Sequence, residues 1–140
     1  MATTKARRLR RGRFKDEFLT TGLIISVVDD DESVRVSTEG LLRSLGYAAR
    51  GFASAEAFLE SDAAAGSACI VSDVHMPGLS GVDLKSALSA RGIATPVILM
   101  TAFPNEATRQ KANALGVVCF LHKPFQAQAL IDCIETALAV

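Results

Sequence analysis

The feature that most constrains the fold of this chain is a regular alternation of short apolar runs with longer helical patterns, beginning at residue 23. The apolar runs are rich in β-branched residues and apolar on both faces, as central strands of a parallel sheet are. We expect strands at 23–28, 68–72, 96–100 and 117–121, and a weaker strand at 47–52. We expect helices at 32–45, 54–64, 81–91, 105–115 and 127–139. This order predicts an α/β domain with a doubly wound parallel sheet and helices on both faces.

Three glycines mark where helices should end. Gly46, Gly92 and Gly116 each follow a helical pattern and precede a strand. Glycine adopts the left-handed conformation of a helix C′ position without strain, so these residues favour helix termination. The 105–115 helix has only Leu115 and several alanines for packing, and we expect it to be the least firmly held.

The composition supports one domain with a substantial core. The chain has 140 residues, of which 49% are hydrophobic, and this is enough to bury an interior. No apolar run approaches the roughly 18 residues needed to cross a bilayer. Cys69, Cys119 and Cys133 lie in apolar segments without metal-type spacing, and we see no secretory signal. We therefore expect a protein of the reducing cytoplasm, without membrane association.

Charge divides the chain into a basic arm at 1–22, with a net charge of +5, and a domain at 23–140, with a net charge of −5. The arm lacks a helical apolar stripe, and we expect it to be flexible. Three interpretations of it remain open: a solvated tail or a start codon assigned too far upstream, docking on an acidic surface that includes its own domain, and nucleic-acid binding. The last is the least favoured, because the arm contains no helix that could read bases. Its basic residues are Lys5, Arg7, Arg8, Arg10, Arg11, Arg13 and Lys15.

Polar side chains stand where four of the predicted strands end. Asp29 and Asp30 follow the first strand, Asp73 follows the third, Thr101 the fourth and Lys123 the fifth. Ligand sites of doubly wound sheets lie beyond the carboxyl ends of the strands. We therefore expect these five side chains to meet at one edge of the sheet. Each of them has an ordinary structural explanation when taken singly, such as a helix cap or a turn residue. Their occurrence together at four strand ends favours a functional site.

The residue types in this set suit a phosphoryl group. Neighbouring carboxylates repel one another unless a cation compensates for their charge, and Mg²⁺ prefers a few carboxylates with water and a phosphate oxygen. A lysine and a hydroxyl complete a receptor for a phosphoryl group. An exposed aspartate beside the metal can itself be the nucleophile and form an acyl phosphate. Acids replace the glycines of a nucleotide-binding loop after the first strand, so we do not expect a stably bound nucleotide.

The segments that carry these residues resemble the receiver domain of two-component response regulators. They are VVDDDESVR (27–35), VSDVHMPGLSG (71–81), LMTA (99–102) and FLHKPF (120–125). The sequences MPGLSG and FLHKPF are most similar to the corresponding segments of receivers of the nitrogen-fixation regulator type. The resemblance covers residues 23–140 and implies a flavodoxin-like receiver fold, a five-stranded parallel sheet with strand order 2-1-3-4-5.

The resemblance also implies roles for individual residues. Asp73 would be the phosphoacceptor, taking a phosphoryl group from the phosphohistidine of a sensor histidine kinase or a phosphotransfer protein. Asp30 and Asp73 would bind Mg²⁺ directly together with the backbone carbonyl of His75, and Asp29 would act mainly through metal-bound water. Lys123 would pair with a phosphoryl oxygen.

Further roles follow from the same resemblance. Thr101 would hydrogen-bond another phosphoryl oxygen, and Phe120 would be the aromatic switch that turns inward as Thr101 moves. The Lys123–Pro124 peptide is expected to be cis. The side chain of His75 would either overhang the phosphoryl group or be an exposed loop histidine, and in the family this position and that of Phe103 influence dephosphorylation. We place Arg35 on a solvated helix face.

The function that we favour is a phosphorylation-controlled signalling switch, not an enzyme, whose 105–139 surface changes for a downstream protein partner. Homodimerisation on phosphorylation stays open. One alternative is a small aspartyl-phosphate phosphatase, which would need an acid where His75 stands. Another is a DNA-binding regulator, but Val140 directly follows the last predicted helix. We therefore expect a single-domain response regulator without a DNA-binding output domain, with a receiver fragment of a longer transcriptional regulator as the alternative.

Overall fold

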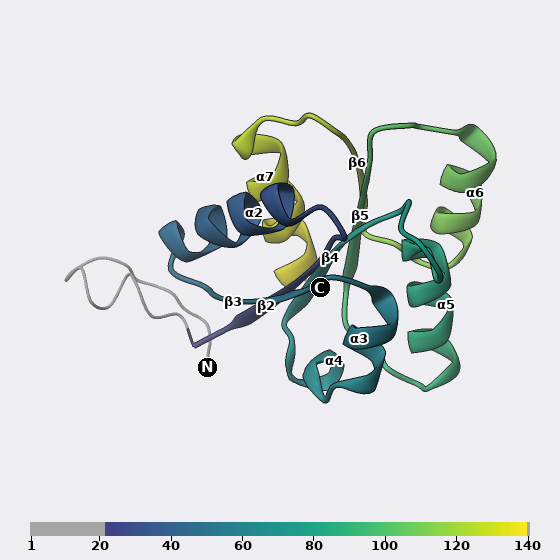
Figure 1. Cartoon of the computed structure of the whole chain (residues 1–140), viewed down its shortest axis with the longest axis horizontal. Coiled ribbons are helices and arrows are strands. Elements are labelled where there is room, and N and C mark those ends of the chain that lie inside the picture. Colours follow the sequence, from purple (N-terminus) through teal and green to yellow (C-terminus); the bar gives the residue numbers. More distant parts are fainter. Residues whose placement is uncertain (1–21, 140) are drawn as a thin grey trace.

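The computed structural model of the chain describes residues 22–139, so the predicted basic arm lies outside the described residues except for Gly22. Strands and helices alternate along the described chain, except that two short helices follow β3 in succession (Figure 1). In chain order they are β2 (Ile24–Val28), α2 (Glu32–Ser44), β3 (Ala48–Phe52), α3 (Ala55–Glu60), α4 (Ala63–Gly66), β4 (Cys69–Asp73), α5 (Gly81–Ala90), β5 (Val97–Thr101), α6 (Glu106–Ala114), β6 (Cys119–His122) and α7 (Ala127–Leu138). All five predicted strands are present within two residues of their expected bounds.

The five strands form one parallel sheet in the order β3-β2-β4-β5-β6. This is the order 2-1-3-4-5 that the resemblance implied, so the predicted fold is confirmed. The order reverses between β2 and β4, which follow one another in the sheet but are separated by β3 in the chain. Parallel pairing brings the carboxyl ends of β2, β4, β5 and β6 to the same edge.

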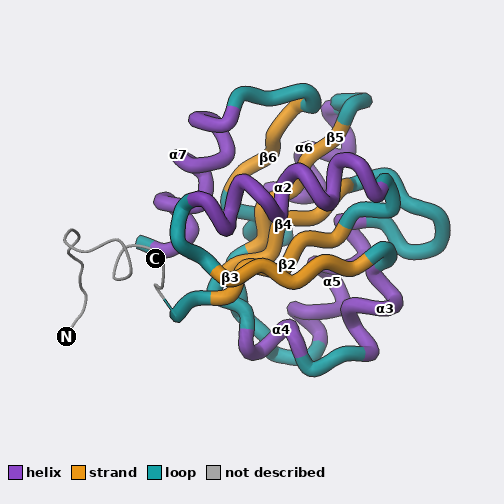
Figure 2. The backbone as a smooth tube through the Cα atoms, turned by 60° about the vertical axis from the view of Figure 1, so that its left-hand side comes forward, coloured by secondary structure: helices purple, strands orange, loops and turns teal. Residues whose placement is uncertain are grey.

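Helices cover both faces of the sheet (Figure 2). Alternate residues of β5 show the two layers: Ile98 and Met100 belong to the core cluster with α2 and α7, whereas Val97 and Leu99 belong to the cluster with α3, α4 and α5. All four are fully buried. Strands that are apolar on both faces are what a sheet covered on each side requires.

One helix prediction was wrong in its extent. The expected 54–64 helix is two short helices, α3 and α4, because Ser61 adopts an extended backbone between them. The Ser61 hydroxyl donates to the carbonyl of Phe58 at 2.6 Å and accepts from the N–H of Ala63 at 3.1 Å. A serine that satisfies backbone groups on both sides competes with continued helical hydrogen bonding.

The three predicted glycine terminators are confirmed. Gly46, Gly92 and Gly116 have φ angles of 96°, 73° and 84°. The N–H of Tyr47 donates to the carbonyl of Leu42, which closes the end of α2 in a Schellman motif. The same pattern of backbone hydrogen bonds closes α5 and α6.

Three further observations concern the packing of α6, the cysteines and membranes. In α6 the only buried residue is Ala112, which leaves that helix with little buried surface. Cys69 and Cys133 are buried and Cys119 is half-buried, and all three are free thiols; burial raises the pKa of Cys69 to about 12. Within residues 22–139, no helix combines the length and the apolar character that a bilayer span demands.

Candidate functional site

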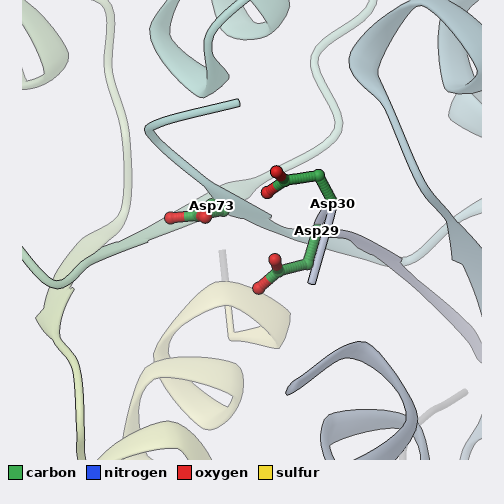
Figure 3. A group of neighbouring side chains, drawn as sticks. All are labelled: Asp29, Asp30 and Asp73. Carbon is green, nitrogen blue, oxygen red and sulfur yellow. The ribbon is translucent and has the colours of Figure 1, made fainter. Parts of the chain in front are cut away.

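Three carboxylates meet where β2 and β4 end. Asp29 and Asp30 come directly after β2, and Asp73 is the last residue of β4. One carboxylate oxygen of each lies within 4.8 Å of the others (Figure 3). The two strands are hydrogen-bonded neighbours in the sheet, with Val28 opposite Ser72. The local backbone is well fixed, because the Asp29 N–H donates to the carbonyl of Phe52 at 3.0 Å.

The ammonium of Lys123 lies against this acidic group. Its Nζ is 3.1 Å from Oδ2 of Asp29 and 3.4 Å from Oδ2 of Asp73. Asp29 is fully buried, and its other carboxylate oxygen accepts the N–H of Asp31 at 2.9 Å. Lys123 therefore bridges the ends of β2 and β4 from the end of β6.

The pocket perturbs two of its charged groups. Burial, together with the negative charge of Asp29, raises the pKa of Asp73, although Lys123 opposes that rise. Burial alone would lower the pKa of Lys123, but the hydrogen bond and charge of Asp29, with the charge of Asp73, outweigh it and raise that pKa. Among the described residues, three carboxylates lie beside the one ammonium of Lys123, so these side chains together carry an excess of negative charge.

The donor set fits a hard divalent cation. In the part of the chain that the structure describes, the clustered side-chain ligands are the carboxylate oxygens of Asp29, Asp30 and Asp73, and Mg²⁺ prefers such oxygens. The two oxygens of Asp29 already bind Lys123 and a backbone N–H. Asp30 is exposed and Asp73 is only partly neutralised by Lys123. This distribution fits direct ligation by Asp30 and Asp73 better than direct ligation by Asp29.

Thr101 occupies a different side of the pocket, at the end of β5. Its side chain is buried, and its Oγ1 lies 3.0 Å from Nδ1 of His75 and accepts the N–H of Phe103 at 3.0 Å. The rings of His75 and Phe103 meet edge to face, with centroids 5.9 Å apart. The Lys123 N–H donates to the Thr101 carbonyl at 2.7 Å and joins the ends of β5 and β6. His75 is exposed, as one of the two sequence interpretations expected, but neither of them included its hydrogen bond to Thr101.

Phe120 lies in β6 opposite Leu99 and is half-buried. Its ring packs against the core cluster on the α3, α4 and α5 face of the sheet. The Lys123–Pro124 peptide that follows is cis, as the resemblance implied.

Sequence reasoning placed Arg35 wrongly. We expected a solvated side chain, but Arg35 is half-buried, and its Nη1 donates to the backbone carbonyl of Asp29 at 2.7 Å. The available signal was its position: the capping side chain of Asp31 starts α2, and Arg35 lies one helical turn later. A residue there faces back toward the strand end that precedes the helix.

Sequence reasoning also missed Gly81. A Cβ atom at this position would collide with the backbone carbonyl oxygen of Asp73 and would lie 2.9 Å from Cδ2 of Leu99. The Gly81 N–H donates to the Val74 carbonyl at 3.0 Å. The first residue of α5 must therefore be glycine for the helix to approach the end of β4 this closely. The glycine at the start of a helix was the signal.

The fold and this pocket define a class: a doubly wound α/β domain with an acidic, lysine-bearing pocket at the switch point of its parallel sheet. The family model of the response regulator receiver domain matches residues 25–135, and the chain belongs to this family. It is therefore a receiver domain of the two-component signalling type.

Named relatives agree with this family. The chain is 41% identical over 116 residues to the transcriptional regulatory protein FixJ of Azorhizobium caulinodans, covering 83% of this chain and 55% of FixJ. It is 40% identical over 116 residues to the transcriptional regulatory protein TdiR of Thauera aromatica, covering 83% of this chain and 51% of TdiR. The chain thus spans about half the length of these curated relatives. The structure of the Vibrio cholerae chemotaxis protein CheY4 superposes with a TM-score of 0.76 at 26% identity, covering 83% of this chain and 98% of CheY4.

Proposed function

We propose that this receiver domain is a phosphorylation-controlled switch in which Asp73 accepts a phosphoryl group from the phosphohistidine of a sensor histidine kinase or a phosphotransfer protein. The observation that carries the proposal is the position of the Asp73 carboxylate, 3.4 Å from the Lys123 ammonium and within 4.8 Å of carboxylate oxygens of Asp29 and Asp30. A nucleophilic carboxylate, a cation site and an ammonium are what transfer of a phosphoryl group requires.

In this proposal the Asp73 carboxylate attacks the phosphorus in line with the phosphorus–nitrogen bond of phosphohistidine. The new phosphorus–oxygen bond forms as the phosphorus–nitrogen bond breaks, and the imidazole nitrogen keeps the electron pair. Lys123 neutralises charge on the phosphoryl oxygens, and Asp29 holds Lys123 in place through its 3.1 Å hydrogen bond. The Thr101 hydroxyl donates to a second phosphoryl oxygen.

Bound Mg²⁺ supplies further positive charge that stabilises the phosphoryl oxygens. Asp30, Asp73 and the backbone carbonyl of His75 would hold it, with Asp29 contributing mainly through metal-bound water. These residues fit that ion because they are oxygen ligands at a site with excess negative charge.

The output of the switch is the surface formed by residues 105–139. Phosphorylation of Asp73 reorients Thr101, and Phe120 turns inward as Thr101 moves. The limited burial of α6, with Ala112 as its only buried residue, supports a surface that changes at low cost. A downstream protein binds this surface, and a second copy of the chain is an alternative occupant. We place the protein in the cytoplasm, where the kinase domains of such systems work.

Two observations bear on the alternatives. Where a phosphatase of this kind needs an acid to protonate the leaving group, this chain has His75, whose Nδ1 is hydrogen-bonded to Thr101; this argues against a phosphatase. The relatives named as transcriptional regulatory proteins are about twice as long as the matched region. A receiver that belongs to a longer transcriptional regulator therefore remains an alternative to the single-domain form. The mass of the protein detected by antibody in its source cells distinguishes these two forms.

The phosphoacceptor is tested by incubating the protein with acetyl phosphate and Mg²⁺ and separating the products on a Phos-tag gel. We expect a retarded band for the wild type and none for Asp73→Asn or in the presence of EDTA. Equal retardation of the wild type and Asp73→Asn would refute the assignment of Asp73. Turnover of p-nitrophenyl phosphate well above background would favour the phosphatase instead.

A further inference from the structure

The loop of residues 74–80, which joins β4 to α5, is attached to the rest of the domain at its base and at its tip. At the base, the Gly81 N–H donates to the carbonyl of Val74 at 3.0 Å. At the tip, the Leu79 N–H donates to Oε2 of Glu56 at 3.0 Å. Glu56 lies in α3, 23 residues earlier in the chain. A side chain from a separate helix therefore holds the tip of the loop that follows Asp73.

Glu56 takes the place of the acceptor that a closed turn would supply. Pro77 and Gly78 stand in the order that is typical of the two central residues of a type II turn, and the φ angle of Gly78 is 79°, close to the roughly 80° of such turns. In a closed turn of this type the Leu79 N–H would donate to the carbonyl of Met76. Here it donates to the Glu56 carboxylate. The conformation of the tip thus depends on a residue outside the loop.

The loop sequence leaves room for this carboxylate. A Cβ atom added to Gly78 would collide with Oε2 of Glu56, and a side chain at a positive φ would also be strained. The two glycines of the MPGLSG segment therefore permit two different close contacts. Gly78 admits the Glu56 carboxylate, and Gly81 admits the backbone of Asp73.

The backbone of α3 gives Glu56 a firm base. Ala55 and Phe58 are fully buried, and the Ser54 hydroxyl caps the helix by accepting the N–H of Ala57 at 3.0 Å. In contrast, Oε1 of Glu56 is buried and has no hydrogen-bond partner within the described residues. Burial of an unpaired carboxylate oxygen is unfavourable. Stability alone does not account for a glutamate here, and this favours a role in shaping the loop.

We propose that Glu56 is a positioning residue whose carboxylate holds the 74–80 loop in the shape that presents the backbone carbonyl of His75 to Mg²⁺. The inference rests on the proposed function, in which that carbonyl is a ligand of the ion. It adds a residue outside the pocket to the groups on which metal binding depends. His75 lies between the two attachments of the loop, so release of the tip frees its peptide to turn. A loop that spends less time in the binding conformation binds the ion more weakly in the same proportion.

Two variants separate the reach of the Glu56 side chain from its charge. Glu56→Asp keeps the charge but is one methylene too short for the bond to Leu79, whereas Glu56→Gln keeps the length and an acceptor oxygen without the charge. The affinity of the unphosphorylated protein for Mg²⁺ is measured by titration, following the amide resonance of Asp30 by NMR. We expect Glu56→Asp to bind roughly 2- to 10-fold more weakly than the wild type, the equivalent of one net hydrogen bond. Glu56→Gln should bind like the wild type.

Glu60→Ala is the matched control, because Glu60 is an exposed carboxylate of the same helix. It should bind Mg²⁺ like the wild type. Equal affinities of the wild type and Glu56→Asp would overturn the proposal. A Glu56→Gln variant that binds as weakly as Glu56→Asp would also overturn it, because the acceptor oxygen would then not matter.

Hydrogen exchange without Mg²⁺ gives a second readout that is independent of the ion. We expect the Leu79 amide to exchange faster in Glu56→Asp than in the wild type and Glu56→Gln. The amide of Leu99, a fully buried residue of β5, is the internal reference and should exchange equally in all three proteins. Unchanged exchange at Leu79 would contradict the proposal, and equal acceleration at Leu79 and Leu99 would show only a general loss of stability and would contradict it as well.

Failure of the proposed function gives a different result. In that case the wild type is not labelled by acetyl phosphate with Mg²⁺, or Asp73→Asn is labelled. If labelling is confined to Asp73 and Glu56→Asp still binds Mg²⁺ like the wild type, the proposed function stands and only the role of Glu56 is refuted.

Discussion

The two sides of the pocket are held in different ways. On the charged side, Lys123 lies between Asp29 and Asp73, and Asp29 is fully buried. On the hydroxyl side, Thr101 is held by neutral hydrogen bonds beneath two exposed rings, those of His75 and Phe103. Buried ions are costly to separate, whereas a neutral hydrogen bond is exchanged for another at little net cost. The charged side is therefore suited to remain fixed, and the hydroxyl side is suited to move.

The largest effect should come from Lys123→Met on the charged side. Removing one member of a buried pair leaves the other charge uncompensated, at a cost of about 3–5 kcal/mol. Because the Lys123 side chain keeps 16% of its exposure, we expect a loss of about 3 kcal/mol in the free energy of unfolding, measured with urea in EDTA. Added Mg²⁺ should restore part of this loss, since the cation replaces the missing positive charge.

The matched control for Lys123→Met is Arg43→Met. The ion pair of Arg43 with Glu39, at 3.5 Å, involves an arginine side chain that is 56% exposed. Such a pair is worth about 0.5 kcal/mol or less. Similar losses in the two variants would show that the charged side is no more tightly held than a surface ion pair.

Gly81→Ala tests how closely the start of α5 packs against the backbone of Asp73 on the charged side of the pocket. The new Cβ would collide with the Asp73 carbonyl oxygen, and forcing such a contact costs about 1–3 kcal/mol. We expect a loss of about 2 kcal/mol in stability and slower labelling of Asp73, because α5 or the end of β4 must shift. Gly40→Ala in α2 is the control, because no atom lies within 4 Å of its added Cβ. It should gain up to about 1 kcal/mol from helix propensity, so the two substitutions should have opposite signs.

The charged side was also the part of the site that the sequence predicted best. Periodicity located all five strands, and the rule that ligands gather at the carboxyl ends of parallel strands then selected Asp29, Asp30, Asp73 and Lys123 without a structure. The same rule selected Thr101. Strand ends are predictable because sheet topology fixes where they lie, whatever the intervening loops do.

The contacts that sequence reasoning missed depend on loops and on side-chain reach. The bond from Arg35 to the Asp29 carbonyl and the bond between His75 and Thr101 join residues whose relative positions are set by turns, and no periodicity encodes these distances. The division of the 54–64 helix depended on two hydrogen bonds of one serine, Ser61. These contacts can therefore be identified only from the three-dimensional structure of the loops.

Asp73→Asn should have a smaller effect on stability than Gly81→Ala, and of opposite sign. The pKa of Asp73 is raised by burial and by the charge of Asp29, so the ionised carboxylate destabilises the folded state. This penalty appears as the pH rises from the ordinary aspartate pKa, about 3.9, through the raised value, and it persists above that value. At pH 7 without Mg²⁺ we expect Asp73→Asn to be more stable than the wild type by about 0.5–2 kcal/mol.

The pH dependence provides the control for Asp73→Asn. The stability difference between the variant and the wild type should narrow as the pH falls through the raised pKa of Asp73 and below the ordinary aspartate pKa, where the carboxyl is protonated in both folded and unfolded states. It should also shrink when Mg²⁺ stabilises the wild type. A less stable Asp73→Asn at pH 7 in EDTA would mean that Lys123 compensates fully for the burial of Asp73.

The smallest effect should come from Phe103→Ala on the hydroxyl side. The Phe103 ring is 71% exposed and contacts the edge of the His75 ring, while the hydrogen bond to Thr101 comes from the backbone N–H and survives the substitution. We expect a change in unfolding free energy within about 0.5 kcal/mol. Phe58→Ala, which truncates a fully buried ring, should cost about 3–5 kcal/mol under the same conditions. If Phe103→Ala instead cost 2 kcal/mol or more, the exposed rings would be part of the folded core, and the hydroxyl side could not move as cheaply as the two-sided pocket requires.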